Sequence, residues 1–334
     1  MMVSLHIACM NDDVKTVERL HDHGANIDTK DENGASPLNY ACGKGQVDIV
    51  KLLLQKKAFT ESYDNRSRTP IFNAARYGHT EVVRLLVEHD AIINARDKNG
   101  DTALIAAVTA GHSEVVRVII SISWGKNIRN KHGSTALNCA IGKRHAQVVK
   151  VLLVGCPKSK HLILTDQYGL SPAHVAALSG ILETIRLLME YGLNYKKFNL
   201  KKKDLSGSTP LHLAASKGFA EAVKLLQDAE QGVIDAQDNG GWTPLHLAVK
   251  DGHTGVVELL LEHGAGINIS NNEGHTPLHT ALQHRVTRVI ELLSQNVPKA
   301  NTTIESRPIP KDYNSDSDNL FMSWLDILSR LVTA

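Results

Sequence analysis

Histidine is the most frequent residue type with potential for chemistry in this 334-residue chain, which holds seventeen histidines and four cysteines. Both side chains bind transition metals, and histidine is also a common general acid or base. No two of the cysteines have the C-x-x-C spacing of a zinc or redox site. The sparse thiols favour a reducing compartment, so we expect a cytoplasmic protein, with the nucleus as the alternative. The cysteines are Cys9, Cys42, Cys139 and Cys156.

Twelve histidines recur at three fixed positions of a repeating pattern, which explains them without any chemistry. Five lie two residues before a closing alanine: His6, His174, His212, His246 and His279. Four follow a glycine position: His79, His112, His145 and His253. Three precede a small-residue break: His23, His89 and His263. Outside the pattern, His21 lies near Glu18, which leaves a weak surface metal site as an alternative to solvated side chains. We expect no metal site and no cofactor.

The sequence contains none of the short motifs that mark common catalytic sites. Phosphate-binding G-x-x-x-x-G-K-[ST], dinucleotide-binding G-x-G-x-x-G, hydrolase G-x-S-x-G and zinc-protease H-E-x-x-H are all missing. Without a nucleophile, a metal site or a phosphate loop, no residue is assigned a catalytic role. We therefore predict that the chain is not an enzyme.

A six-residue segment that ends in alanine occurs nine times in one register. Complete examples are T-P-L-H-L-A at 209–214 and 243–248. Thr or Ser suits a helix N-cap, and Pro suits the first helical position because its missing N–H would have no partner there. An apolar run at helical spacing and a glycine-containing turn then follow. The closing alanines are residues 8, 41, 74, 107, 140, 176, 214, 248 and 281.

T-P-L-H-x-A at a period near thirty-three residues resembles the ankyrin repeat. The resemblance covers residues 1–303 and implies an all-α solenoid of helix–turn–helix units with short β-hairpin loops. The predicted repeats lie near 1–33, 34–66, 67–99, 100–132, 133–168, 169–206, 207–240, 241–273 and 274–303. We expect a polar linker at 304–318 and an amphipathic helix at 319–334, which either caps the ninth repeat, docks a partner or begins an F-box-like adaptor.

The middle of the array departs from the motif. Repeats four and five have Ala103 and Ala136 in place of proline, and we expect them to be less stable than repeats seven and eight. At the histidine position, other residues occur in repeats two to five: Asn39, Phe72, Ile105 and Asn138. The chain also starts directly at a motif, so the first repeat is either a polar end cap or an internal repeat of a longer array.

Charge and hydropathy limit the classes of partner. The net charge is only +2, so a chain-wide nucleic-acid surface is not expected, and no apolar stretch is long enough to span a membrane. The lysine-rich loop Lys196–Lys203 allows a nucleic-acid, anionic-lipid or nuclear-import contact, but a soluble insertion is the simpler interpretation. We expect a monomer whose partners are other proteins, with an acidic surface.

The resemblance implies that partners contact the hairpin tips and the concave helix face. These positions carry a predominantly basic stripe, together with aromatic residues of the types enriched in interface hot spots. A solvated face is the alternative for the stripe, and packing on a neighbouring hairpin is the alternative for Trp242. The candidate partner-binding residues are Lys44, Arg66, Arg68, Arg76, Tyr77, Lys98, Lys131, Lys143, Tyr168, Trp242, Lys250 and His275.

The function that follows is a protein–protein interaction scaffold or adaptor. Two alternatives come from other classes: the regulatory or targeting region of a larger enzyme, and the substrate-recognition subunit of a ubiquitin ligase. The fold alone does not distinguish them, because a fold does not determine a function.

Overall fold

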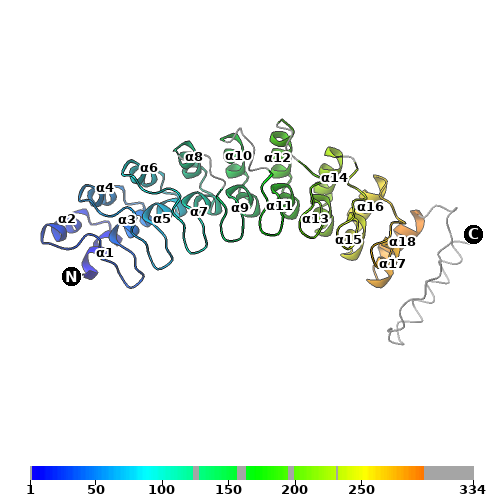
Figure 1. Ribbon diagram of the computed structural model, residues 1–334, viewed down its shortest axis with the longest axis horizontal. Coiled ribbons are helices and arrows are strands. Elements are labelled where there is room, and N and C mark those ends of the chain that lie inside the picture. Colours follow the sequence, from blue (N-terminus) through cyan, green and yellow to red (C-terminus); the bar gives the residue numbers. More distant parts are fainter. Residues whose placement is uncertain (1, 123–127, 156–162, 195–198, 231, 297–334) are drawn as a thin grey trace, which may run out of the picture. The chain divides into compact units, whose positions relative to one another are not determined.

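The structure of the protein is a computed structural model that describes residues 2–122, 128–155, 163–194, 199–230 and 232–296 (Figure 1). The described residues form eighteen helices in nine successive pairs. The first helices are α1 (Met2–Met10), α3 (Pro37–Lys44), α5 (Pro70–Arg76), α7 (Ala103–Ala110), α9 (Ala136–Gly142), α11 (Pro172–Ser179), α13 (Pro210–Ser216), α15 (Pro244–Lys250) and α17 (Pro277–Gln283). The second helices are α2 (Val14–Asp22), α4 (Val47–Gln55), α6 (Thr80–Glu88), α8 (Ser113–Ile122), α10 (Ala146–Val154), α12 (Leu182–Asn194), α14 (Ala220–Ala229), α16 (Thr254–Glu262) and α18 (Thr287–Asn296).

The helix contacts confirm the predicted all-α solenoid. The chain divides into two compact units, Met1–Pro210 and Leu211–Ala334. In the first unit α1, α3, α5, α7, α9 and α11 pack in succession, and so do α2, α4, α6, α8, α10 and α12. In the second unit α15 packs on α16 and α17, and α14, α16 and α18 follow one another. The predicted linker 304–318 and helix 319–334 lie outside the described residues.

The loops between repeats are tight turns, and no β-strand occurs in the part of the chain that the structure describes. In the first such loop the Asp31 N–H donates to the Ala35 carbonyl at 3.0 Å, and the Gly34 N–H donates to the Asp31 carbonyl at 2.9 Å. These two bonds close a hairpin turn, and the chain enters the next helix directly afterwards. The loops thus keep the hairpin turn of the predicted fold without an assigned strand in the described residues.

The helix starts follow the predicted capping chemistry. The Thr243 hydroxyl accepts the backbone N–H of His246, and Pro244 occupies the first helical position. Thr276 and Pro277 repeat the arrangement with His279. Proline has no N–H to leave unpaired, and the threonine hydroxyl pairs a backbone N–H of the first turn that would otherwise lack a partner. This motif therefore stabilises the first turn.

The motif histidines also join one repeat to the next. Nδ1 of His174 accepts the Ser171 N–H at 3.2 Å, and its Nε2 donates to the Ser208 carbonyl at 3.0 Å. His246 pairs in the same way with Thr243 and with the His275 carbonyl. Burial is the main cause that lowers the pKa of both imidazoles. Each ring is therefore neutral at pH 7, with its proton on Nε2.

Acid should weaken the fold through these two rings. The folded pKa lies below the unfolded value, so the unfolded state takes up protons first as the pH falls below about 6.5. The contribution of these two neutral rings to the free energy of unfolding is complete above that pH and decreases as the pH falls toward 5. Urea titrations at pH 7.5 and pH 5 should show a smaller pH difference in His174→Asn/His246→Asn than in the parent chain. An equal pH difference in both proteins would contradict this assignment.

Asparagine takes over the histidine role in repeat two. Oδ1 of Asn39 accepts the Ser36 N–H at 3.1 Å and its hydroxyl at 2.8 Å, and Nδ2 donates to the Arg68 carbonyl at 3.3 Å. The two atoms of the amide thus replace the two nitrogens of imidazole. Asn138 keeps the link to the next repeat through the Leu170 carbonyl. By contrast, the Phe72 and Ile105 side chains are apolar, so the link is lost there.

Replacing Asn39 by alanine should therefore lower the free energy of unfolding by about 1–3 kcal/mol, because buried N–H and carbonyl groups lose their partners. Asn39→His should retain most of the stability, since histidine makes the same bonds in other repeats. The control is Asn99→Ala in an exposed loop, with an expected change below about 0.5 kcal/mol. Chemical denaturation that finds Asn39→Ala as stable as the control would contradict this role.

Candidate functional site

One polar side chain holds each loop in shape. Oδ1 of Asp64 accepts the backbone N–H of Arg66 at 2.8 Å and of Arg68 at 2.9 Å. Aspartate or asparagine makes the same two bonds in the other described loops, at Asp31, Asp97, Asn130, Asp166, Asp204, Asp238 and Asn271. The side-chain oxygen therefore fixes the direction in which each loop residue points.

The tips of successive loops are also joined by backbone hydrogen bonds. The Lys98 N–H donates to the Arg66 carbonyl at 3.0 Å, and the Lys131 N–H donates to the Asn99 carbonyl at 2.9 Å. These bonds place the tips of repeats three, four and five side by side. Little conformational entropy remains to be lost when a partner binds, and this preorganisation favours affinity.

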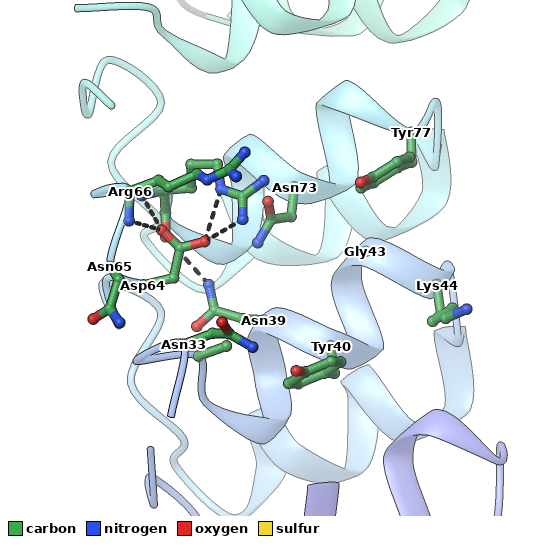
Figure 2. Close-up of a pocket in the computed structure, with 12 residues that line it drawn as sticks. Asn33, Asn39, Tyr40, Gly43, Lys44, Asp64, Asn65, Arg66, Asn73 and Tyr77 are labelled. Carbon is green, nitrogen blue, oxygen red and sulfur yellow. Dashed lines mark hydrogen bonds and ion pairs between the residues drawn. The ribbon is translucent and has the colours of Figure 1, made fainter. Parts of the chain in front are cut away.

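A groove lies between the loops 31–35 and 64–68 and the first helices of repeats two and three, α3 and α5. Its cavity has a volume of about 600 Å³. Figure 2 shows Arg66 at the loop end of the groove and Lys44 and Tyr77 at the helix end, with Tyr40 and Asn73 between them. Loop tips and helix ends therefore form two separate edges with a polar floor between them.

The predicted basic stripe includes three residues that line this groove, Lys44, Arg66 and Arg68, and continues beyond it on the loop tips and first-helix ends of repeats three to five. Six of its side chains are exposed, and none makes an ion pair within the described part of the chain. One edge carries Arg66, Lys98 and Lys131, and the other carries Lys44, Arg76 and Lys143. Cations in the last turn of a helix also stabilise its dipole, which gives Lys44 and Arg76 a structural role besides any partner contact.

Arg68 differs from the other basic residues because its charge is already paired. Its guanidinium lies 2.6 Å from Oδ2 of Asp64, and Nε donates to the same carboxylate at 2.7 Å. The Asp64 side chain is 4% exposed. Arg68 therefore helps to hold the loop, and the free positive charge of the groove comes from its neighbours. The sequence did not reveal this pair.

The aromatic candidates lie in three different environments. Tyr77 is 53% exposed and lines the groove, and Tyr168 is 61% exposed at the tip of a loop in repeat six. Trp242, in the second unit, is half-buried, and the Lys250 ammonium group lies 5.1 Å from its ring centroid. Trp242 also contacts His246 edge to face at 5.8 Å. Intramolecular packing therefore accounts for much of the Trp242 surface.

His275, the remaining candidate in the second unit, is also engaged by its neighbours. Its Nδ1 lies 3.2 Å from a Glu273 carboxylate oxygen, and its ring stacks on His279 at 6.2 Å between centroids. The site thus separates into a groove in the first unit and three candidates engaged by neighbouring side chains, Trp242, Lys250 and His275, in the second.

Asp31, Asp101 and Tyr40 have shifted pKa values, and the hydrogen bond to Asp31 is the main cause that raises the pKa of Tyr40. Burial acts to raise the pKa of Asp31, but bonds from the Tyr40 hydroxyl at 2.6 Å and from two backbone N–H groups outweigh it and lower that pKa. Burial raises the pKa of Asp101, although Asn130 donates to its carboxylate at 3.0 Å. Asp101 is half-buried, and the positive charge of Arg76 acts to lower its pKa.

The described cysteines are poor nucleophiles. Burial raises the pKa of the Cys9 thiol to about 12 and that of Cys139 to about 11, and the pKa of buried Cys42 lies well above its usual range. All three are free thiols. At neutral pH they are protonated and serve as packing residues.

The described residues include no cluster of three histidine, cysteine or acidic side chains that could hold a metal ion. In the same residues, no helix has both the length and the apolar character needed to cross a membrane. Of the lysine-rich loop, residues 195–198 lie outside the described residues, while Lys202 donates to the Ile163 carbonyl at 2.9 Å.

Asn73 is one of the groove residues that the sequence did not predict as a contact. It lies on α5, is 7% exposed and lines the groove. The signal available in the sequence was a polar side chain one residue before the closing alanine, where repeat four has Ala106. Only the structure shows that this position forms the floor between the two basic edges.

A family model described as "Ankyrin repeats (3 copies)" matches residues 5–97, 57–131, 92–163, 119–199, 153–238, 194–271 and 228–305. No curated protein matches the chain. Ankyrin repeats are general protein–protein interaction modules and are typically non-catalytic. The matched windows overlap and together cover residues 5–305. The chain therefore belongs to the ankyrin-repeat family.

Proposed function

We propose that the chain is a non-enzymatic scaffold or adaptor that binds an acidic segment of another protein. The binding site is the basic groove, defined as Lys44, Arg66, Arg68, Arg76, Tyr77, Lys98, Lys131 and Lys143. The observation that carries the proposal is the row of unpaired cations along two edges of one preorganised surface. Tyr168, Trp242, Lys250 and His275 are secondary contacts, and the protein acts as a monomer in the cytoplasm or nucleus.

Charge supports an acidic partner over a neutral one. A run of like charges along a groove raises the local concentration of an oppositely charged segment and speeds its association. A standard interface buries about 800 Å² on each partner, an area that several neighbouring repeats can supply together. The exposed ring of Tyr77 adds apolar contact area within the same surface.

A random peptide library displayed on phage tests this function directly. Peptides retained by the full chain should be enriched in Asp and Glu, and a soluble acidic peptide should release them. The comparison protein is Lys51→Glu/Arg84→Glu, which changes the charge of exposed positions on α4 and α6 and should select the same peptides. Retained peptides without an acidic bias would contradict the proposal. The proposal would also be contradicted if an oligonucleotide released the bound peptides as effectively, per negative charge, as the acidic peptide does.

A further inference from the structure

Asn73 has an unusual position for a buried amide. Its side chain is 7% exposed, and within the described residues its carboxamide makes no hydrogen bond. The Asn73 amide atoms are not among the fully buried polar atoms that lack a partner, so they reach the solvent in the groove. An amide that lines a groove without a partner is therefore a candidate contact for a ligand.

The neighbouring asparagine shows what a structural amide looks like in the same place. Asn39 uses both atoms of its amide, with Oδ1 accepting from Ser36 and Nδ2 donating to the Arg68 carbonyl. Asn73 lines the same groove on the next first helix without such bonds. Figure 2 shows the two amides side by side in the groove, with the dashed bond on Asn39 only.

Gly43 leaves space beside the Asn73 Cβ atom and the Tyr77 ring. A Cβ atom added at Gly43 would lie 3.9 Å from Asn73 Cβ and 3.8 Å from the Tyr77 ring. Any larger side chain at position 43 would extend into the space between them. The missing side chain thus keeps a recess open, with Asn73 on its floor and the exposed Tyr77 ring at its edge.

The groove around this recess is positively charged. Its lining residues include three cations, Lys44, Arg66 and Arg68, and one carboxylate, Asp64, so the lining carries a net charge of +2. The Asp64 carboxylate is held by Arg68, which leaves Lys44 and Arg66 as free charges. A neutral amide donor between free cations suits an anionic group that also needs a directed hydrogen bond.

We propose that the recess formed by Gly43, Asn73 and Tyr77 is an anchor pocket for one anionic side chain of the bound segment. The Asn73 Nδ2 group donates to an oxygen of that side chain, and Lys44 and Arg66 neutralise its charge. A carboxylate and a phosphate monoester share this chemistry, and both occur on peptide side chains. The inference rests on the proposed function, since it specifies how one residue of the acidic segment is held.

The test uses a fluorescein-labelled acidic peptide selected by the full chain, with binding followed by fluorescence anisotropy. Asn73→Ala should weaken binding about tenfold, the loss expected for one hydrogen bond to a charged group. It should leave the melting temperature nearly unchanged, because no hydrogen bond of the Asn73 amide within the described residues is lost. Asn39→Ala, in contrast, should lower the melting temperature.

Changes in the peptide identify the anchored residue. At one position, Glu→Gln should weaken binding to the parent chain but have little further effect on Asn73→Ala. Peptides with glutamate or with phosphoserine at that position distinguish the two sources of the anion, and the tighter of the two is the better fit. If every Glu→Gln change is equally costly in both proteins, no single anchor exists and the pocket is wrong.

Gly43→Ala gives an independent readout. Alanine is favoured over glycine within a helix, so this variant should be at least as stable as the parent chain, yet bind severalfold more weakly because the recess is narrowed. Lys51→Glu/Arg84→Glu should bind normally. Unchanged binding in both Asn73→Ala and Gly43→Ala overturns the pocket. If the two pocket variants bind normally but Lys98→Glu/Lys131→Glu binds more weakly, only the pocket is wrong and the proposed function remains. If Lys98→Glu/Lys131→Glu also binds normally, the pocket and the proposed function are both wrong.

Discussion

Reversing three charges of the basic groove should weaken binding of a selected acidic peptide by roughly 100-fold. The variant is Arg66→Glu/Arg76→Glu/Lys98→Glu. Each side chain is exposed and unpaired within the described structure, and reversal replaces one attraction of about 0.5 kcal/mol by a repulsion of similar size. Three such changes add to about 3 kcal/mol. Fluorescence anisotropy at low and at physiological ionic strength measures the loss.

The matched control reverses three charges on second helices of the first unit. Lys51, Arg84 and Lys150 are exposed on α4, α6 and α10, and replacing them by glutamate gives the same change of net charge. We expect this control to bind within a few-fold of the parent chain, with the same melting temperature. Equal losses in the two triple variants would show that net charge matters and that the groove does not. The loss should also shrink at high salt, because salt screens exposed charges.

Replacing Asp64 by alanine should lower the free energy of unfolding by about 3 kcal/mol. The carboxylate accepts two backbone N–H bonds from its own loop and holds the Arg68 guanidinium, while its side chain is only 4% exposed. Each lost bond costs about 0.5–1.5 kcal/mol, and bonds to a charged group cost more. Asp64→Asn should lose about half as much, since Asn130 and Asn271 hold the same turn in other repeats.

Urea denaturation followed by circular dichroism measures both changes. The control is Asp48→Ala, an exposed acidic residue in the first turn of α4, with an expected loss below about 1 kcal/mol. If Asp64→Ala is no less stable than Asp48→Ala, the loop does not depend on the carboxylate. The description of a preorganised loop edge would then lose its main support.

The period of the sequence was enough to predict the fold. The N-cap, the proline and the closing alanine recur at nearly constant intervals, and each has a local physical reason that does not depend on distant contacts. The helix pairs follow from this pattern. The period gives the length of each loop but not whether its short arms count as strands, and the described loops are hairpin turns without an assigned strand.

Residue identity alone was less informative where the role depends on a neighbouring repeat. Asn39 looked like a loss of the motif, whereas its amide keeps both histidine contacts. The sequence suggested an unpaired charge at Arg68, whereas the turn of the loop places its guanidinium beside the Asp64 carboxylate. Trp242 looked exposed, but Lys250 lies over its ring. Each case needs the distance between side chains that are four to twenty-nine positions apart.

The location of a bound peptide is the most direct test of the central claim. Hydrogen–deuterium exchange with mass spectrometry should be measured on the full chain with and without a selected acidic peptide. We predict slower exchange in α3, α5, α7 and α9 and in the loops 64–68, 97–101 and 130–134, because these segments form the two edges and the floor of the groove. Protection confined to α4, α6, α8 and α10, or to residues 211–296, would contradict the account.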